Sequence, residues 1–274
     1  MRLDGTVGVV TGGASGIGRA TALELGRRGA RAVAIADVNE NRLAEAAAEL
    51  EALGTTALPV RCDVSRDEDV DHLRDTVLDR FGQVDVVMNN AGVVLLGPAD
   101  TLSMAEWDWL LQINLYGVIR GVRAFVPHLR HQGHGWLVNT ASVAGLYAHA
   151  WDVIPYVTAK FGVAGLTEAL ALYLRPLGVG VSLLCPGRVE TNMADTARVG
   201  GTPDIGQWLQ AMPLEAPVAP AVPGRLVCDA IEQDRYLILT HPDAVRPRLA
   251  ERATDPDGFV RHQIERLPTP PNLP

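Results

Sequence analysis

Short apolar segments alternate with longer amphipathic segments along the first 185 residues. The short segments are apolar at nearly every position, which is typical of strands buried on both faces of a sheet. We predict strands at 7–11, 32–37, 57–62, 84–89, 135–141 and 180–185. Between them the apolar positions recur with a helical period, and we predict helices at 16–28, 40–53, 66–81, 104–131 and 157–177. Strands and helices that alternate in this way form right-handed βαβ units, so the pattern predicts an α/β fold with a doubly wound parallel sheet.

The pattern changes in the last third of the chain. Residues 190–223 are rich in Gly, Pro and Ala and contain no clear strand. A loop of that length in a compact domain is usually functional, so we predict a helical or loop lid over a substrate site. A helix at 220–233 and a strand at 235–240 complete a single catalytic domain over residues 1–240. Residues 241–274 form a C-terminal extension, whose proline-rich end LPTPPNLP we expect to be extended or disordered.

Two of the predicted helices have a recognisable signal at the N-terminus. Ser65 with Glu68, and Ser103 with Glu106, form Ser-x-x-Glu pairs where a helical segment starts. Such pairs are typical of a capping box, in which the two side chains bind free backbone N–H groups. We therefore predict a capping box at both positions.

Composition and charge exclude several classes of function. The 274 residues include 24 Lys and Arg against 32 Asp and Glu, a formal net charge of −8 with no basic stripe, so we expect no nucleic-acid partner. No uninterrupted apolar run approaches the ~18–20 residues of a membrane helix, and the N-terminus lacks a signal-peptide pattern. Cys62, Cys185 and Cys228 are far apart in apolar surroundings, which is typical of buried thiols and not of disulfides or a metal site. We expect a cytoplasmic protein without a membrane segment or a metal.

A glycine-rich turn joins the first predicted strand to the first helix. Gly12, Gly16 and Gly18 let the backbone turn tightly and approach a ligand, and a helix N-terminus attracts a pyrophosphate. Asp37 ends the second strand, where a carboxylate can bind an adenosine ribose and repel a 2′-phosphate. These features predict a dinucleotide cofactor, NAD in preference to NADP. The alternatives are an ordinary strand–helix connection and an acid at a helix N-terminus.

Six motifs then occur in order along the chain. They are T-G-x-x-x-G-x-G at 11–18, NNAG at 89–92, Asn114 in INLYG, Ser142 in NTASVAG, Tyr156-x-x-x-Lys160, and PGRVET at 186–191. In this order and at these intervals they resemble the short-chain dehydrogenase/reductase family over roughly residues 3–240. The chain departs from the family in one respect, because Ser142 and Tyr156 are fourteen residues apart, one more than we expect. We place the extra residue in the loop 143–155.

The resemblance implies a Rossmann-type sheet that binds NAD along its carboxyl edge. The implied catalytic residues are Asn114, Ser142, Tyr156 and Lys160. The implied cofactor site comprises Gly12, Ser15, Gly16, Ile17, Gly18, Asp37, Val38, Asp63, Val64, Asn90, Ala91, Gly92, Tyr156, Lys160, Pro186, Gly187, Val189 and Thr191. Within this site, the family pattern places Asp63 and Val64 beside the adenine and residues 186–191 at the nicotinamide end.

Tyr156 and Lys160 are four residues apart and therefore share a helix face, which suits a proton transfer. When a ketone accepts a hydride its oxygen takes a proton, and alcohol oxidation is the reverse. We expect Lys160 and an oxidised nicotinamide to lower the pKa of Tyr156 from its ordinary value of about 10. Ser142 can hydrogen-bond the substrate oxygen, and the resemblance implies that Asn114 interrupts its helix and holds a water near Lys160. Taken singly, the four are equally compatible with packing, solvated or turn residues.

The residues that we assign to the substrate pocket are largely apolar. The expected wall comprises Val94, Leu95, Val143, Trp151, Met193 and the 200–215 segment with Trp208, and its polar members are His149, Asp152 and Arg188. We therefore predict a small-molecule substrate, a hydrophobic secondary alcohol or its ketone, aromatic or cyclic. For Arg188 the alternatives are contact with an anionic substrate, contact with the cofactor amide, and a surface ion pair.

The resulting prediction is an NAD-dependent oxidoreductase that interconverts a secondary alcohol and its ketone. An enoyl-thioester reductase usually spaces its Tyr and Lys more widely, and a sugar-nucleotide epimerase has a different glycine turn. A non-catalytic NAD-binding regulator of the same fold would not need the four catalytic residues. The helices at 104–131 and 157–177 carry more apolar positions than one sheet contact needs, and the resemblance implies a homodimer or homotetramer.

Overall fold

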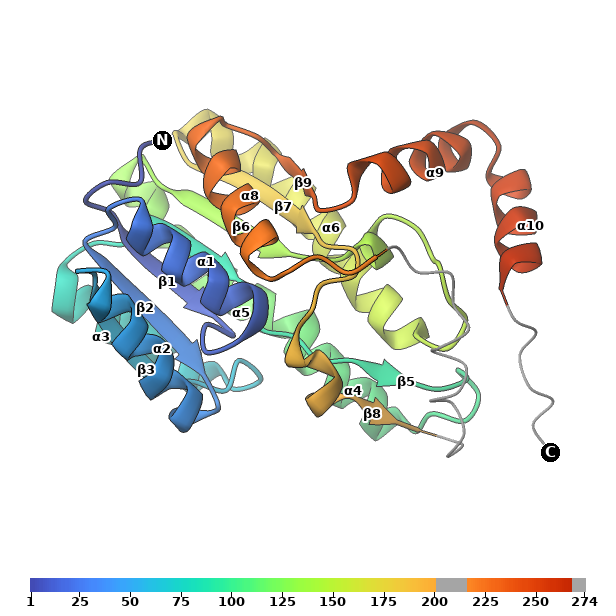
Figure 1. Cartoon of the computed structure of the whole chain (residues 1–274), viewed down its shortest axis with the longest axis horizontal. Helices are drawn as coiled ribbons and strands as arrows, with labels where there is room; N and C mark the ends of the chain where they lie inside the picture. Colours follow the sequence, from blue (N-terminus) through green and yellow to red (C-terminus); the bar gives the residue numbers. More distant parts are fainter. Residues whose placement is uncertain (201–215, 268–274) are drawn as a thin grey trace.

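The computed structural model describes residues 1–200 and 216–267, which form one parallel sheet between two layers of helices (Figure 1). The sheet has the strand order β3-β2-β1-β4-β6-β7-β9. Its strands are β1 Val7–Thr11, β2 Ala32–Asp37, β3 Thr56–Arg61, β4 Val86–Asn89, β6 Trp136–Thr140, β7 Gly180–Cys185 and β9 Leu237–Leu239. Every predicted strand is present with its ends shifted by at most two residues, and the doubly wound α/β fold is confirmed.

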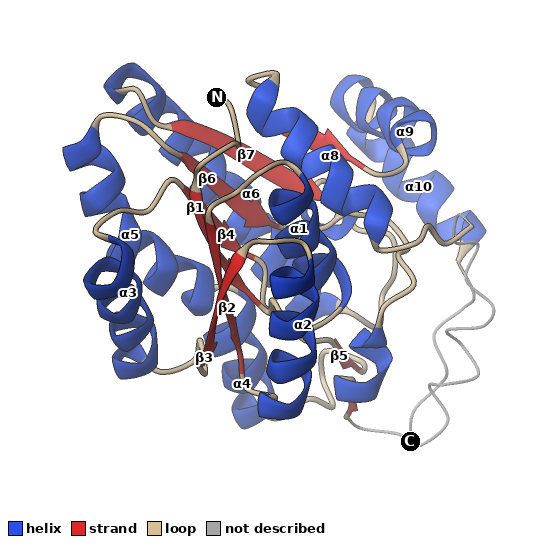
Figure 2. Cartoon of the chain, turned by 60° about the vertical axis from the view of Figure 1, so that its left-hand side comes forward, coloured by secondary structure: helices blue, strands red, loops and turns tan. Residues whose placement is uncertain are grey.

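Alternate side chains of each strand face opposite helical layers, which explains why the strands are apolar at nearly every position. On β2, Val33 and Ile35 pack toward one layer, and Ala34 packs toward the other. Figure 2 shows the sheet edge-on between these layers. One layer contains α1 Gly16–Arg27, α2 Glu40–Ala52 and α8 Ala221–Glu232, and the other contains α3 Asp67–Phe81, α5 Tyr116–Gln132 and α6 Ile154–Leu174.

The strand order reverses between β1 and β4, because β2 and β3 lie on one side of β1 and the later strands lie on the other. In open α/β sheets, ligands bind at the carboxyl ends of the strands where this reversal occurs. The glycine turn after β1 and the NNAG segment after β4 therefore meet at the edge where a ligand site is expected.

A local break divides the helix that we predicted at 104–131. α4 Met104–Asn114 ends at Asn114, and α5 begins at Tyr116 after Leu115, which has φ −113° and ψ −58°. The Asn114 side chain accepts a hydrogen bond from the Val93 N–H and donates one to the Val93 carbonyl, each at 2.8 Å. The interruption at Asn114 agrees with the resemblance.

The two predicted capping boxes have different outcomes. Ser103 and Glu106 form the reciprocal pair at the start of α4, as predicted. The prediction for Ser65 and Glu68 is wrong, because the Ser65 hydroxyl donates to Asp63 Oδ1 at 2.7 Å and α3 begins after Arg66. A carboxylate two residues away thus replaces the free N–H groups as the partner of this serine.

The segment after β7 contains a short strand that the sequence did not reveal. β8 Arg198–Val199 pairs in parallel with β5 Leu95–Leu96, and a 3₁₀ turn at Asn192–Thr196 precedes it. Two-residue strands paired across a hundred residues leave no local pattern to detect. The rest of the predicted lid over 201–215, with Trp208, and the tail at 268–274 lie outside the described residues.

The C-terminal extension contains two helices that we did not predict, α9 Pro242–Thr254 and α10 Pro256–Arg266 (Figure 1). Each has proline at its first position, which is favourable for a helix start. The extension packs against the segment that follows β6. The Tyr147 and Phe259 rings meet edge to face with centroids 5.9 Å apart, and Arg252 Nη1 donates to the Leu146 carbonyl at 2.6 Å.

Among the described residues, one helical segment is long and apolar enough to cross a membrane on length and composition alone. It is Ile154–Leu177, with a mean hydropathy of 1.3. The segment contains Lys160, which is buried, and it packs against β7 and α4. Cys62, Cys185 and Cys228 are free and buried, as predicted.

Candidate active site

The turn between β1 and α1 has a backbone conformation that favours glycine. Gly12 and Gly16 have φ values of 63° and 50°, in the left-handed region. A Cβ atom on Gly18 would lie 2.2 Å from the Gly12 carbonyl oxygen, so the turn also requires a residue without a side chain there. Gly12, Ser15, Gly16 and Ile17 line a cavity, which we call the first cavity.

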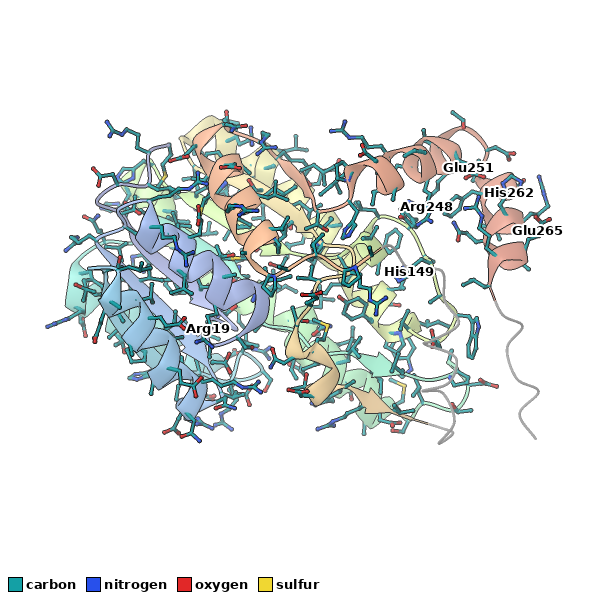
Figure 3. All side chains as sticks on the ribbon, viewed as in Figure 1. Arg19, His149, Arg248, Glu251, His262 and Glu265 are labelled. Carbon is teal, nitrogen blue, oxygen red and sulfur yellow. The ribbon has the colours of Figure 1, made fainter. Side chains whose placement is uncertain are left out.

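Asp37, at the end of β2, lines the same cavity. Its Oδ2 accepts from the Ala14 N–H at 3.3 Å and its Oδ1 accepts from the Asn39 N–H at 3.1 Å, so the carboxylate is held beside the glycine turn. Arg19, which directly follows Gly18 of the glycine turn, extends from α1 toward α2, where it pairs with Glu49 at 2.9 Å (Figure 3). Beside the glycine turn, the first cavity is therefore lined by two charged groups, the carboxylate of Asp37 and the guanidinium of Arg42.

Most of the remaining predicted cofactor residues also line the first cavity. They are Val38, Asp63, Val64, Asn90, Ala91, Gly92, Tyr156, Lys160, Pro186 and Thr191. The other three do not line the first cavity. Gly18 packs against Gly12, Gly187 lines a neighbouring cavity, and Val189 pairs with Val218. One cavity thus connects Asp37 with Tyr156 and Lys160.

Asn114 and Lys160 approach the same point from two helices. A Cβ atom on Gly92 would lie 3.4 Å from Asn114 Oδ1 and 3.7 Å from Lys160 Nζ. Lys160 is only 3% exposed, and its Nζ donates to the Thr140 carbonyl at 2.8 Å. Gly92 thus lies beside both polar groups, of which Lys160 lines the first cavity and Asn114 is fully buried behind it.

Tyr156 lies in the first turn of α6, one turn before Lys160, whose Nζ is 5.5 Å from the centre of the tyrosine ring. Ser142 follows β6 and begins a 3₁₀ turn, in which its Oγ accepts from the Ala144 N–H at 3.1 Å. Ser142 also hydrogen-bonds the Tyr156 hydroxyl. The fold therefore brings all four predicted catalytic residues to one place at the carboxyl edge of the sheet.

The protein groups around Tyr156 do not by themselves shift its pKa in the direction that we expected. Burial raises the pKa of its hydroxyl, and the hydrogen bond with Ser142 offsets this only in part. Burial also lowers the pKa of Lys160 to about 8. For the protein groups alone the pKa of Tyr156 is therefore raised, because removing a phenolate from water outweighs the hydrogen bond with Ser142. The expected lowering also includes an oxidised nicotinamide and stays a prediction for the complex with NAD.

A second cavity meets the first one at Tyr156, Pro186 and Met193, which line both. Ser142 lines the second cavity as well. Of the residues that we predicted for the substrate pocket, Val94, Val143, Arg188, Met193 and His149 line it. Tyr156 thus stands between the two cavities, and Ser142 lies beside it in the second.

Comparison with known proteins identifies the chain. Residues 6–200 match the family described as short chain dehydrogenase. The chain belongs to the short-chain dehydrogenase family. It is accordingly an oxidoreductase of a family that binds a nicotinamide cofactor.

Individual relatives of this short-chain dehydrogenase differ in the cofactor they carry. The 1-deoxy-11-beta-hydroxypentalenate dehydrogenase of Streptomyces exfoliatus is 36% identical over 262 residues, which cover 93% of this chain and 90% of the relative. A short chain dehydrogenase/reductase from Burkholderia phymatum, solved in complex with NAD, is 35% identical with a TM-score of 0.86 and covers 100% of both chains. An alcohol dehydrogenase from the archaeon Thermococcus sibiricus, complexed with 5-hydroxy-NADP, is 28% identical with a TM-score of 0.73, over 85% of this chain and 95% of that one.

Three residues predicted for the substrate wall of this short-chain dehydrogenase do not line the second cavity as the structure describes it. Leu95, the first residue of β5, is fully buried among Leu110 and Ala159, whereas the preceding Val94 lines the cavity. Neither Trp151 nor Asp152 lines the cavity, and Asp152 is fully buried.

Part of the cavity wall was not predicted from the sequence. The additional lining residues are Tyr147, Val153, Arg248, Gln263, Arg266 and Leu267. Four of them belong to the C-terminal extension, whose length was the one signal that it had a role. Figure 3 shows Arg248 on the side of α9 toward the loop that carries His149.

Proposed function

We propose that this short-chain dehydrogenase is an NAD-dependent alcohol dehydrogenase that interconverts a secondary alcohol and its ketone. The position of Tyr156 carries this proposal. Its side chain lines both cavities, so a group bound in the first cavity and a group bound in the second meet at its hydroxyl. A proton donor at such a junction suits a reaction between a cofactor and a small substrate.

The first cavity fits a dinucleotide. The glycine turn gives close access to the start of α1, where N–H groups attract a pyrophosphate. A side chain at Gly18 would meet the backbone of Gly12, and one at Gly92 would stand against Asn114 and Lys160. The Asp37 carboxylate supports NAD over NADP, because a 2′-phosphate beside it would place two negative charges together. When bound, the nicotinamide supplies the group that accepts or donates the hydride.

The four polar residues then divide the proton chemistry. Tyr156 exchanges a proton with the substrate oxygen at its hydroxyl, and Ser142 orients that hydroxyl and stabilises the charge on the oxygen. Lys160 contributes a buried positive charge that favours the phenolate once the site is closed. Asn114 fixes the backbone of Val93 and faces the same point as Lys160, which suits a water in a proton path between them.

The second cavity supports a hydrophobic, cyclic substrate body. Val94, Val143, Val153 and Met193 give it an apolar wall beside Ser142 and Tyr156. The Streptomyces relative, named for a hydroxypentalenate, supports a cyclic secondary alcohol as the substrate class.

Purified protein, NAD and a panel of cyclic and aromatic secondary alcohols test this function by the absorbance of NADH. We expect turnover with NAD that exceeds turnover with NADP. A protein that binds NAD but oxidises no alcohol and reduces no ketone of the panel is a regulator of the same fold, which is the main alternative.

We also propose a homodimer or homotetramer in the cytoplasm. On the outer faces of α5 and α6, Tyr116 and Ile119 are 47% and 37% exposed, and Leu172 and Tyr173 are 77% and 49% exposed. Apolar side chains at such exposure support a subunit contact. Leu172→Glu should reduce the mass measured by sedimentation, and an unchanged mass argues against contact through these helices.

A further inference from the structure

Three arginines from separate segments line the second cavity. Arg188 follows β7, Arg248 lies on α9 and Arg266 ends α10. Within the described part of the chain, no Asp or Glu lines this cavity. The whole chain has 32 acidic against 24 basic residues, so a cavity with three guanidinium groups and no described acid departs from the overall balance.

Arg188 and Arg266 have charges that the described residues do not neutralise. Neither guanidinium forms an ion pair or a hydrogen bond with any side chain or carbonyl in residues 1–200 and 216–267. Other arginines of the chain are held firmly. Arg28, for example, pairs with Asp229 at 2.7 Å and with Glu232 at 2.6 Å. An arginine is always charged at neutral pH, so Arg188 and Arg266 offer positive charge to a ligand.

The extension that carries two of these arginines is held against the catalytic segment. Arg248 Nη1 lies 3.4 Å from the Tyr147 hydroxyl, and its guanidinium carbon lies 6.0 Å from the centre of the Tyr147 ring. Tyr147 is 1% exposed and also packs on Phe259 of α10. Since Tyr147 lies five residues after Ser142, α9 and α10 are positioned directly by the segment that carries the proposed catalytic serine.

The second cavity therefore has two chemically different parts. Ser142 and Tyr156 stand at its junction with the first cavity, beside apolar side chains such as Val94 and Met193. The arginines come from the segments after β7 and from the extension. A ligand whose hydroxyl reaches Tyr156 can place an apolar body against the valines and an anionic group against the guanidiniums.

We propose that the substrate carries a carboxylate, which Arg188 and Arg266 bind with support from Arg248. The substrate class is thus a cyclic hydroxy acid and its keto acid, and the C-terminal extension is a specificity-determining element. A carboxylate matches the planar fork of a guanidinium through two parallel hydrogen bonds, which a lysine cannot provide. This assignment rests on the proposed function for the reacting end of the substrate.

Matched pairs of ligands test the assignment. The probes are hydroxycyclohexane and hydroxyindane carboxylates, each compared with its neutral methyl ester, in steady-state assays with NAD. We expect kcat/KM for the acid to exceed that for the ester by about 10-fold or more. Arg188→Gln and Arg266→Gln should each lower kcat/KM for the acid by about 10- to 100-fold, mainly through KM, and leave the ester unchanged.

Two further variants separate charge, fork geometry and folding. Arg266→Lys keeps the charge but not the forked geometry of the guanidinium. We expect its kcat/KM for the acid to lie between the values for the wild type and for Arg266→Gln. Arg261→Gln, on the same helix and outside the cavity lining, should leave both substrates unaffected. Thermal unfolding of each variant verifies that it folds. Equal kcat/KM for acid and ester in the wild type, or equal losses on both substrates in the arginine variants, would overturn the assignment.

Binding measurements distinguish this inference from the proposed function. Titration calorimetry of the Tyr156→Phe variant saturated with NAD, in which the proposed proton donor is removed, measures the affinity for each acid and ester without turnover. If no probe is oxidised but the acids bind more tightly than the esters, and Arg188→Gln removes the difference, the anion site holds and the reaction is wrong. If the esters are oxidised and bind as well as the acids, the reaction holds and the anion site is wrong.

Discussion

Lys160 Nζ lies 5.5 Å from the centre of the Tyr156 ring, and the two side chains line the same cavity. Lys160 donates a hydrogen bond to the Thr140 carbonyl and none to the tyrosine hydroxyl. The hydrogen-bond partner of that hydroxyl is Ser142. Of the two side chains, the serine is the one that lowers the pKa of the Tyr156 hydroxyl, and any effect of the ammonium on the phenol must act across this distance. We therefore expect Lys160 and Ser142 to influence the Tyr156 hydroxyl in different ways.

Replacement of Tyr156 by Phe removes the proposed proton donor and keeps the ring. We expect turnover to fall by about 10²- to 10⁴-fold, the usual range for the loss of a general acid or base. The affinity for NAD, measured by fluorescence titration, should stay nearly constant because the ring remains in the cavity. Tyr173→Phe, on the exposed side of the same helix, is the control and should retain full activity. A Tyr156→Phe enzyme with normal turnover would refute the mechanism.

Lys160 should make stability depend on pH at high pH. Burial lowers its pKa in the folded protein from 10.5 to about 8, so the folded state favours the neutral amine. The stability linked to this shift is fully present above the unfolded pKa and is lost as the pH falls through the folded one. Relative to Lys160→Met, the free energy of unfolding of the wild type should therefore rise between about pH 8 and pH 10.5, by on the order of 3 kcal/mol across the window.

Denaturant unfolding of both proteins without cofactor, at several pH values across this window, measures that difference. Titrating groups far from Lys160 cancel when the variant is subtracted from the wild type, and the same comparison in a Tyr156→Phe background removes the contribution of the neighbouring phenol. A difference that does not change with pH means that Lys160 is already solvated in the folded protein.

Local patterns were sufficient to predict the sheet, the glycine turn and Asp37, whereas the other residues of the first cavity were predicted from the family resemblance. The central strands are apolar at nearly every position because both faces are covered, and this burial leaves a direct trace in the sequence. Gly12, Asp37, Tyr156 and Lys160 lie at fixed distances from strand ends, so correct strands placed them at one edge of the sheet. The structure then adds the geometric detail, for example the Cβ clash at Gly18.

The features that could not be predicted from the sequence depend on contacts between distant segments. The pairing of Leu95 with Arg198 has no local signal, and one residue of register separates Val94 in the cavity from Leu95 in the core. α9 and α10 are polar helices that dock through a few side chains such as Phe259, so their role in the cavity wall was not visible. The upward effect of burial on the pKa of Tyr156 was not predicted for a similar reason, because the cost of burial is known only from the fold.

Replacement of Asp37 by Ser should relax the preference for NAD. The substitution removes the negative charge that opposes a 2′-phosphate. The guanidinium of Arg42, which lines the same cavity and lies 3.3 Å from Asp195, remains as a positive charge there. We expect the ratio of kcat/KM for NADP to that for NAD to increase by about 10- to 100-fold. Glu40→Gln, which removes an exposed charge just after β2 without lining the cavity, should leave the ratio unchanged. If both variants change the ratio equally, the long-range field of the protein sets the preference and Asp37 has no special role.

Asp152 should limit the stability of the protein at neutral pH. Its side chain is fully buried, and neither carboxylate oxygen has a hydrogen-bond partner within the described structure. Burial raises its pKa above the ordinary value of 3.8, so the stability linked to this group is present below pH 3.8 and is lost as the pH rises through the folded pKa. Asp152→Asn cannot ionise, and at neutral pH it should increase the free energy of unfolding by on the order of 1–3 kcal/mol. Asp108→Asn, at an exposed position of α4, controls for the lost charge and should change stability little. Denaturant unfolding from mildly acidic to neutral pH should show the advantage of Asp152→Asn growing with pH, whereas a constant or decreasing advantage would mean that the carboxylate is stabilised in the folded protein.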